Sequence, residues 1–483
     1  MIYPVRYPKQ TSWKILYNSF TGFSRRAVEF LSREAGKYLI REKDLYKIYV
    51  VACEQETDKP IEQNAIVVGL YNESKTVQKF ISAEELADKD YCVKIVKNPD
   101  NEDCRIVLIT ANEPRNLLYG SVAFVDNYIV GCSPTHGGLR IPQWTFDYKM
   151  PEFSFAERAE IQTRSVFTWG HPINDYRAYI RNLARLKLNQ VIIWNDYMPL
   201  NASDIVDYAH EYGLEVIWGY SWGWNEGGKL TELSDEFLQR LKEKALAEYE
   251  NNYKGTNCDG IYFQSFTEMS KEYIGDKLIA RVVTDFVNDT AAEFFKRYPN
   301  MKIQFGLHAT SVRNHLDELA RVDKRVEIVW EDCGAFPFNY TPIVRDEKQF
   351  EETLEFTKKI IALRGDAPLG LVVKGFMTLD WEMFVPQNGP FIMGENAPEI
   401  KEWDKTLRAP IWQMFTAGWT AYGNYALRLI REACALTGGK INICMAGAFE
   451  GDITLPQALC AEMAFNPNRE FTEILHKVTA RQS

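Results

Sequence analysis

Residues 175–220 read DYRAYIRNLARLKLNQVIIWNDYMPLNASDIVDYAHEYGLEVIWGY, and this stretch decides the fold. It begins with a segment of helical period at 175–186 and continues into an almost wholly apolar run at 190–195. The same order then repeats, with a helical segment at 203–212 and an apolar run at 215–220. Short apolar runs that alternate with helices are typical of parallel strands buried on both faces.

This alternation extends over the rest of the chain. Eight strands are predicted, at 164–169, 190–195, 215–220, 260–265, 302–307, 326–331, 370–376 and 440–445. Helical segments lie between most of them, at 175–186, 203–212, 234–253, 276–298, 312–320, 348–363 and 410–436. Eight such units predict an α/β fold of the (β/α)8 TIM-barrel type, with a long loop at 376–409 after the seventh strand. The alternative is an open doubly wound sheet, but no GxGxxG or GxxxxGK[ST] motif follows any strand, so its nucleotide-binding forms lack support.

The first third of the chain has a different character. It carries short mixed elements: a helix at 23–38, strands at 46–52, 65–71, 91–96 and 105–109, and a turn and helix at 112–128. Proline and glycine then recur through 131–151, as in a linker. We therefore predict a small α+β domain at 1–155, followed by the barrel at 156–483.

Composition narrows the classes of partner and cofactor. The net charge of −10 argues against nucleic acid, and no apolar run reaches the roughly 18 residues of a membrane span. The N-terminus lacks the charged and apolar regions of a secretory signal, which predicts a cytoplasmic protein. The nine cysteines are scattered without a CxxC pair, and the six histidines show no HExxH spacing, so we expect no disulfide framework, metal or cofactor. Homo-oligomerisation is left open.

Aromatic residues are unusually abundant, at 13% of the chain, with 12 Trp, 25 Tyr and 27 Phe. Such an excess indicates either a large core or platforms for flat ligands such as sugars.

Candidate site residues follow the strands, because TIM-barrel chemistry lies at the carboxyl ends of the strands. Each of the first seven predicted strands is followed by polar or aromatic groups. In chain order these are Trp169 and His171; Asn195 and Asp196; Tyr220, Trp222 and Trp224; Gln264 and Glu268; His308; Glu331 and Asp332; and Lys374, Asp380, Trp381 and Glu382.

Carboxylates after strands four, six and seven suit glycoside cleavage, in which one acid protonates the leaving oxygen and a second carboxylate activates water or attacks the sugar. The candidates are Glu268, Glu331, Asp332, Asp380 and Glu382, while the indoles would stack on the sugar and the other polar groups would bind it. Lys374 and Arg164 are candidates to bind a substrate carboxylate. Each also has a structural interpretation: the acids as caps or ion pairs, His308 as a hydrogen-bonded structural residue, and Trp222 and Trp224 as core.

Four stretches carry a resemblance to known families. Residues 105–128, RIVLITANEPRNLLYGSVAFVDNY, resemble the end of the non-catalytic α/β domain that precedes the barrel in β-N-acetylhexosaminidases and α-glucuronidases. DYRAYIRNLARLKLNQVIIWND and DYAHEYGLEVIWGY are similar to the first helices and strands of their barrels. The ending ALCAEMAFNPNREFTEIL at 458–475 is similar to that of α-glucuronidases.

The resemblance implies a hexosaminidase-like, zincin-like N-terminal domain and a metal-independent, exo-acting glycoside hydrolase with a carbohydrate substrate. The general acid of these families falls on Glu268. Hexosaminidases carry an Asp before it, for substrate-assisted catalysis, where this chain has Thr267. The carboxylates that activate water in α-glucuronidases fall on Asp332 or Glu331 and on Glu382 or Asp380. The alternatives are a non-catalytic carbohydrate-binding barrel and a different barrel enzyme, such as a lyase or isomerase.

Overall fold

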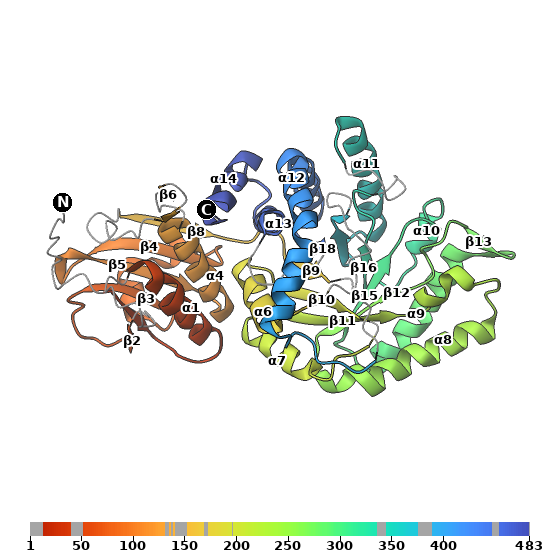
Figure 1. The fold of residues 1–483 in the computed structure, drawn as a ribbon, viewed down its shortest axis with the longest axis horizontal. Coiled ribbons are helices and arrows are strands. Elements are labelled where there is room, and N and C mark those ends of the chain that lie inside the picture. The colour runs from red at the N-terminus through yellow and green to blue at the C-terminus, as the bar shows by residue number, and fades with distance from the viewer. Residues whose placement is uncertain are drawn as a thin grey trace. The chain divides into compact units, whose positions relative to one another are not determined.

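A computed structural model describes residues 13–39, 52–130, 135–136, 139–140, 152–168, 172–195, 197–335, 344–374, 389–446 and 454–482 (Figure 1). The chain divides into two compact units. One comprises Met1–Ala159, Glu211–Gly213 and His476–Ser483, and the other comprises Glu160–His210 and Leu214–Leu475.

The first unit is built on a six-stranded mixed sheet in the order β2-β1-β3-β5-β4-β8. Its strands are β1 (Trp13–Tyr17), β2 (Ala52–Gln55), β3 (Asn64–Leu70), β4 (Tyr91–Asn98), β5 (Asn101–Ala111) and β8 (Phe153–Glu157). Helices α1 (Gly22–Leu39) and α4 (Pro114–Phe124) pack together on one face, as Figure 1 shows. Two short helices, α2 (Lys75–Phe80) and α3 (Ala83–Leu86), contribute Val77 and Leu86 to an apolar core with β1, β3, β4 and β5. This α/β unit includes two strands, β1 and β8, and two helices, α2 and α3, that the sequence did not predict.

The second unit is a closed eight-stranded parallel barrel, so the predicted (β/α)8 fold is confirmed. Its strands in chain order are β9 (Thr163–Phe167), β10 (Gln190–Trp194), β11 (Glu215–Ser221), β12 (Gly260–Gln264), β15 (Lys302–Leu307), β16 (Val326–Trp330), β17 (Leu369–Val372) and β18 (Asn442–Ala446). Pairing of β18 with β9 closes the ring.

Helices follow most barrel strands. They are α6 (Tyr176–Arg185), α7 (Ala202–Glu211), α8 (Asp235–Glu248), α9 (Ile279–Arg297), α10 (Leu316–Leu319), α11 (Glu347–Arg364), α12 (Pro398–Thr437), α13 (Leu455–Phe465) and α14 (Phe471–Gln482). Side chains of Asp175, Ser234 and Asp346 cap α6, α8 and α11 by accepting backbone N–H groups. No helix among the described residues is long and apolar enough to cross a membrane.

Two helical predictions were wrong. The helix expected at 312–320 is a single turn, α10. The helix expected to begin at residue 410 begins at Pro398 instead, because proline is favourable in the first helical turn, and the helix continues through Pro410. The long loop expected at 376–409 therefore ends twelve residues early, at Ala397. Residues 376–388 of that loop lie outside the described residues.

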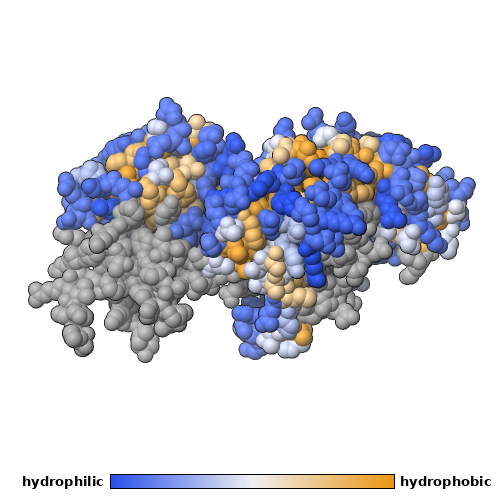
Figure 2. Space-filling view, turned by 90° about the horizontal axis from the view of Figure 1, so that it is seen from above, coloured by the Kyte–Doolittle hydropathy of each residue, from blue (hydrophilic) through white to orange (hydrophobic). Residues whose placement is uncertain are grey.

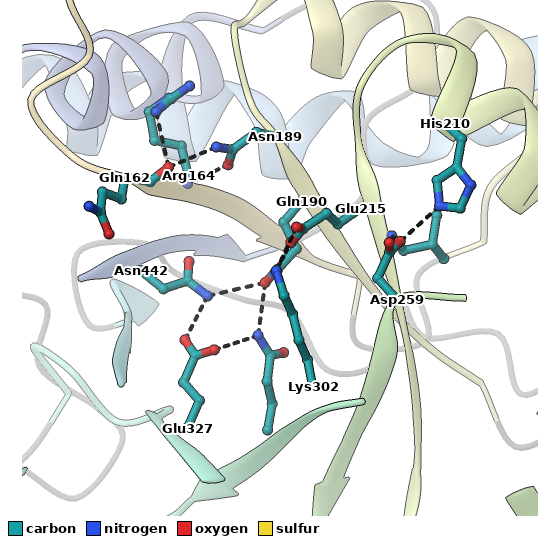
Figure 3. A network of polar contacts seen from close by, with 12 residues as sticks. Gln162, Arg164, Asn189, Gln190, His210, Glu215, Asp259, Lys302, Glu327 and Asn442 are labelled. Carbon is teal, nitrogen blue, oxygen red and sulfur yellow. Dashed lines mark hydrogen bonds and ion pairs between the residues drawn. The ribbon is translucent and has the colours of Figure 1, made fainter. Parts of the chain in front are cut away.

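Strand register decides which side chains enter the barrel. Paired residues of neighbouring strands point to the same side, and Gln304 is paired with Glu327 across β15 and β16. At the amino ends of the strands, a closed ring of hydrogen bonds crosses the interior (Figure 3). The Gln304 amide donates to Gln190 and Glu327, each at 2.9 Å, and the Asn442 amide donates to the same two acceptors at 3.2 and 3.1 Å.

Many of the aromatic side chains that the structure describes lie in the core. Trp222 is 1% exposed and stacks between Phe263, at 3.7 Å between ring centroids, and Phe294 of α9, at 5.5 Å. Trp218 and Trp330 are also fully buried. Hydrophilic residues predominate on the face drawn in Figure 2, with hydrophobic residues gathered in smaller areas. Among the described residues, packing between strands and helices therefore accounts for many of the aromatic side chains.

Candidate functional site

A charged cluster occupies the carboxyl end of the barrel, where β12, β15, β16 and β17 end. His308 directly follows β15, Glu331 and Asp332 directly follow β16, and Lys374 follows β17 by two residues. Glu268 lies four residues after the end of β12. Segments up to 106 residues apart in the sequence thus meet at the rim on which TIM barrels carry their chemistry.

His308 lies at the centre of this cluster and is buried. Its Nδ1 is 3.1 Å from Asp332 Oδ1 and its Nε2 is 3.2 Å from Glu331 Oε2. Burial alone would lower the pKa of His308, but the charges of Glu331 and Asp332 outweigh it and raise the pKa to about 10. At neutral pH His308 is therefore an imidazolium that donates a hydrogen bond from each nitrogen.

The two carboxylates beside His308 are buried and fully engaged. Burial opposes their charge, but His308 and Lys374 hold the pKa of Glu331 and of Asp332 below the usual values. Glu331 Oε1 accepts hydrogen bonds from the Tyr262 hydroxyl and the Gln264 amide. Asp332 Oδ2 accepts the backbone N–H of Ala309 at 2.8 Å, and its Oδ1 lies 3.9 Å from Lys374 Nζ. These contacts show why two acids remain ionised in the barrel interior.

A glycine makes room for this arrangement. A Cβ atom at Gly306 would lie 2.6 Å from Glu331 Oε1 and closer still to the Tyr262 hydroxyl. Gly306 and Tyr262 both project into the barrel from adjacent strands, β15 and β12. The missing side chain at 306 is therefore what lets the Tyr262 hydroxyl reach Glu331.

Glu268 is the carboxylate of this cluster that reaches solvent, with 37% of its side chain exposed. Its Oε2 lies 3.7 Å from His308 Nε2 and accepts a 2.8 Å hydrogen bond from the indole N–H of Trp224. Because Glu331 Oε2 is 3.2 Å from that same histidine nitrogen, the two carboxylates lie no farther apart than these two distances combined. Glu331 and Asp332 balance the charges of His308 and Lys374, so Glu268 is a further acid at the edge of a cluster whose buried charges are already paired.

Trp194 is a site residue that the sequence prediction missed. It ends β10, and its indole meets the rings of Trp224, at 6.1 Å and 83°, and Tyr262, at 6.0 Å and 84°. Gly219 of β11 provides the space, because a Cβ there would lie 2.8 Å from the Trp194 ring. The period-2 alternation of Gln190, Ile192 and Trp194 was the signal that could have placed this indole inside the barrel.

Tyr220 and Trp222 do not join the site, contrary to the prediction. Both alternate with the inward-facing Gly219 and Ser221, so they point outward to the helices. The Tyr220 hydroxyl donates to the backbone carbonyl of Ala245 in α8 at 3.1 Å, and Trp222 lies in the aromatic stack described above. Neither side chain is available to a sugar at the rim.

Arg164 is also structural, so the prediction that it binds a substrate carboxylate was wrong. It lies near the amino end of β9, and its guanidinium donates to the backbone carbonyls of Lys187, at 2.9 Å, and Ile161, at 2.6 Å. These bonds tie together segments at the end of the barrel opposite Glu268.

The remaining predicted residues divide into two groups. Asn195 is partly buried directly after β10, and Gln264, His308 and Lys374 belong to the cluster. Six others lie outside the described residues: Trp169, His171, Asp196, Asp380, Trp381 and Glu382. Over the described ranges, no three His, Cys, Asp or Glu side chains are grouped so as to hold a metal ion, and the eight cysteines they contain are free thiols.

Comparison with known proteins identifies the fold. No protein-family model matches the chain, and no curated protein is similar to it in sequence. Among solved structures, the β-N-acetylhexosaminidase from Bacteroides fragilis is similar with a TM-score of 0.51 and 12% identity, over 98% of this chain and 91% of that one. A GH20 exo-β-N-acetylglucosaminidase from Vibrio harveyi is 11% identical, with a TM-score of 0.47, over 99% of this chain and 74% of that one. The Bacteroides structure shows that both units of this chain, taken together, have a counterpart in one solved protein.

Proposed function

We propose that this protein is a metal-independent glycoside hydrolase in which Glu268 is the general acid. The observation that carries the proposal is the position of Glu268: it is partly exposed at the carboxyl rim of a closed barrel and lies beside an imidazolium fixed by two buried acids. A carboxyl group in that position can hand a proton to a glycosidic oxygen bound at the rim.

Glu331 and Asp332 are assigned a supporting role. Both are almost completely buried, and their oxygens already accept hydrogen bonds from His308, Tyr262 and the Ala309 backbone. An acid so engaged cannot approach an anomeric carbon without breaking these bonds. Their function in the proposal is to keep His308 charged and oriented beside Glu268.

The second carboxylate that the reaction requires is assigned to Asp380 or Glu382. Both follow the seventh strand, β17, and Lys374, the last described residue after that strand, already belongs to the cluster. In the proposed step, the Glu268 proton passes to the glycosidic oxygen, and the C–O bond breaks with its electron pair going to that oxygen. Either the second carboxylate bonds to the anomeric carbon, or water does so and gives its proton to the second carboxylate.

The substrate is proposed to be a carbohydrate from which the enzyme removes a terminal sugar. The Bacteroides enzyme with the similar fold is named a β-N-acetylhexosaminidase, so 4-nitrophenyl N-acetyl-β-D-glucosaminide is the first substrate to test. The panel also includes the corresponding glucoside, galactoside and glucuronide. A cytoplasmic location and a homo-oligomeric state stay predictions.

The test compares the wild type with Glu268→Gln and with the matched control Glu272→Gln. Glu272 lies on the same loop but pairs with His315, at 3.3 Å. We expect the wild type and E272Q to release 4-nitrophenol from at least one member of the panel and E268Q to lose the activity. Equal rates for E268Q and the wild type would refute the assignment.

A second candidate function is a carbohydrate-binding barrel without catalysis. It is favoured by the engagement of Glu331 and Asp332, which leaves Glu268 as the acid of the described cluster that reaches solvent. Calorimetry distinguishes the two candidates: sugar binding without hydrolysis of any glycoside in the panel supports this second function and rejects the first.

A further inference from the structure

The indole of Trp224 contacts the proposed acid directly. Trp224 begins η2 (Trp224–Lys229), a 3-10 helix that follows β11, and is 37% exposed. Its Nε1 donates a hydrogen bond to Glu268 Oε2 at 2.8 Å. This distance lies within the usual range of an N–H···O hydrogen bond.

The backbone on both sides of Trp224 is fixed. The N–H of Trp222 donates to the carbonyl of Gln264 at 2.9 Å, and the N–H of Asn225 donates to Ser221 Oγ at 3.2 Å. Between them, Gly223 has φ +94°, and a Cβ there would lie 2.9 Å from Leu241 Cδ1. These hydrogen bonds and the positive φ of Gly223, a conformation that favours glycine, therefore hold the turn in one conformation. The turn in this way fixes the position of Trp224 relative to Glu268.

Trp194 also contacts the indole ring of Trp224. It meets Trp224 nearly at a right angle and touches Tyr262 in the same edge-to-face manner. The Tyr262 hydroxyl donates to Glu331, and Glu331 contacts His308. Both neighbours of Glu268, Trp224 and His308, thus belong to one connected set of contacts.

Both neighbours approach the same oxygen of Glu268. Trp224 Nε1 and His308 Nε2 lie 2.8 and 3.7 Å from Oε2. The hydrogen bond from Trp224 therefore fixes the carboxyl group of Glu268 at Oε2, on the side that faces His308.

We propose that Trp224 is a positioning residue whose indole N–H fixes Oε2 of Glu268 and so orients the carboxyl group that gives its proton to the glycosidic oxygen. This inference rests on the proposed function of Glu268. In the reaction, the O–H bond of the carboxyl group breaks, a new O–H bond forms on the leaving oxygen, and the indole N–H of Trp224 keeps the carboxyl group in place.

The test uses Trp224→Phe, which keeps an aromatic ring and removes the N–H. We expect kcat on the best aryl glycoside of the panel to fall about 10- to 100-fold, as for loss of one hydrogen bond to a charged group, with KM nearly unchanged. Trp403→Phe is the matched control, because Trp403 is 65% exposed on α12, and it should leave both constants unchanged.

A spectroscopic measurement tests the bond without a substrate. In a spectrum of the 15N-labelled indole groups, the resonance lost in W224F identifies the Trp224 N–H. We expect that resonance to move upfield in E268Q, because an amide oxygen is a weaker acceptor than a carboxylate, and to stay in place in E272Q.

The outcomes separate this inference from the proposed function. If E268Q is inactive while W224F is as fast as the wild type, or if the Trp224 resonance does not move in E268Q, the inference on Trp224 is overturned and the role of Glu268 stands. If E268Q is as active as the wild type, the proposed function is overturned, and the role given to Trp224 with it.

Discussion

The two ends of the barrel interior are both polar, but their chemistry differs. At the amino end, the amides of Gln190, Gln304 and Asn442 form a closed ring with Glu327 (Figure 3). At the carboxyl end, acids and cations meet around His308. The ring at the amino end contains one acid, Glu327, among neutral amides, whereas the carboxyl end brings several charged groups together and extends one acid, Glu268, towards solvent.

This difference distinguishes polar groups that fix the arrangement of the strands from polar groups that are available to a ligand. A ring whose members bond to each other fixes the arrangement of the strands and offers little to a ligand. A cluster of buried charges of opposite sign lowers the stability of the fold, because each charge must lose its hydration. The same cluster provides a fixed electrostatic field at the rim. The following predictions change matched residues at the two ends.

The largest expected difference is in activity after the same chemical change at each end. Glu268→Gln should lower kcat about 10²- to 10⁴-fold, the usual contribution of a general acid, while Glu327→Gln should leave kcat unchanged. Thermal unfolding of both variants provides the control, and E268Q should keep the wild-type melting temperature because its side chain is partly exposed. A comparable loss of kcat in both variants would remove the functional distinction between the two ends.

Replacement of a histidine at each end should affect stability unequally. His308→Gln leaves Glu331 and Asp332 without their cation and should cost about 3–5 kcal/mol. His210→Gln breaks a partly exposed pair with Asp259, which measures 2.9 Å, and should cost about 1 kcal/mol or less. Chemical denaturation measures the free energy of unfolding of both variants. Equal losses would contradict the claim that His308 stabilises two buried acids at the rim.

The wild type should also lose stability above neutral pH through His308. The pKa of this group is raised from 6.5 to about 10 on folding, so its contribution is complete below pH 6.5 and is lost as the pH rises through 10. Within that window the free energy of unfolding should fall by up to about 1.4 kcal/mol per pH unit. H308Q should lack this slope, and a slope of unchanged size in H308Q would assign it to another group.

Two glycines distinguish the packing of the two ends. Gly306→Ala should cost about 1–3 kcal/mol, because its new Cβ would overlap the Tyr262–Glu331 contact. Gly370→Ala should cost less, because its Cβ would lie 3.1 Å from Glu327 Oε1 and 3.2 Å from Val329 Cγ2, distances that small shifts relieve. Denaturant midpoints compare the two, and the reverse order would contradict the packing described for the rim.

The smallest expected effect is the pH dependence of Glu327. Burial raises its pKa, against hydrogen bonds from Gln304 and Asn442 that lower it. A carboxyl group with a raised pKa favours folding most at low pH, and this contribution fades as the pH rises above the usual value of 4.5. The stability of E327Q relative to the wild type should therefore increase over that range, by about 1 kcal/mol or less. A relative stability that decreases with pH would contradict the sign.

The barrel could be predicted from sequence because its signal is local. Runs such as Gln190–Trp194 are apolar, short and bounded by helices, and parallel strands buried on both faces require that pattern. The start of α12 could not be predicted, because Pro410 resembles a helix boundary and only the packing of the complete helix overrides it.

The candidate site could be predicted only in part. The rule that functional groups follow barrel strands identified Glu268, His308, Glu331 and Asp332. It did not show that Glu331 and Asp332 are buried against His308, because their pairing depends on the register of β15 and β16. Nor did it separate Trp224 from Trp222, although strand alternation already places Trp222 on the outer side.

The most direct test of the central claim is the dependence of kcat on the leaving group. Methyl and 2,4-dinitrophenyl glycosides of the same sugar are compared in the wild type and in E268Q. If Glu268 supplies the proton, the loss in E268Q should be about 10²- to 10⁴-fold for the methyl glycoside and should nearly vanish for 2,4-dinitrophenol, which leaves without a proton. A loss of equal size for both leaving groups would contradict the assignment of Glu268 as the general acid.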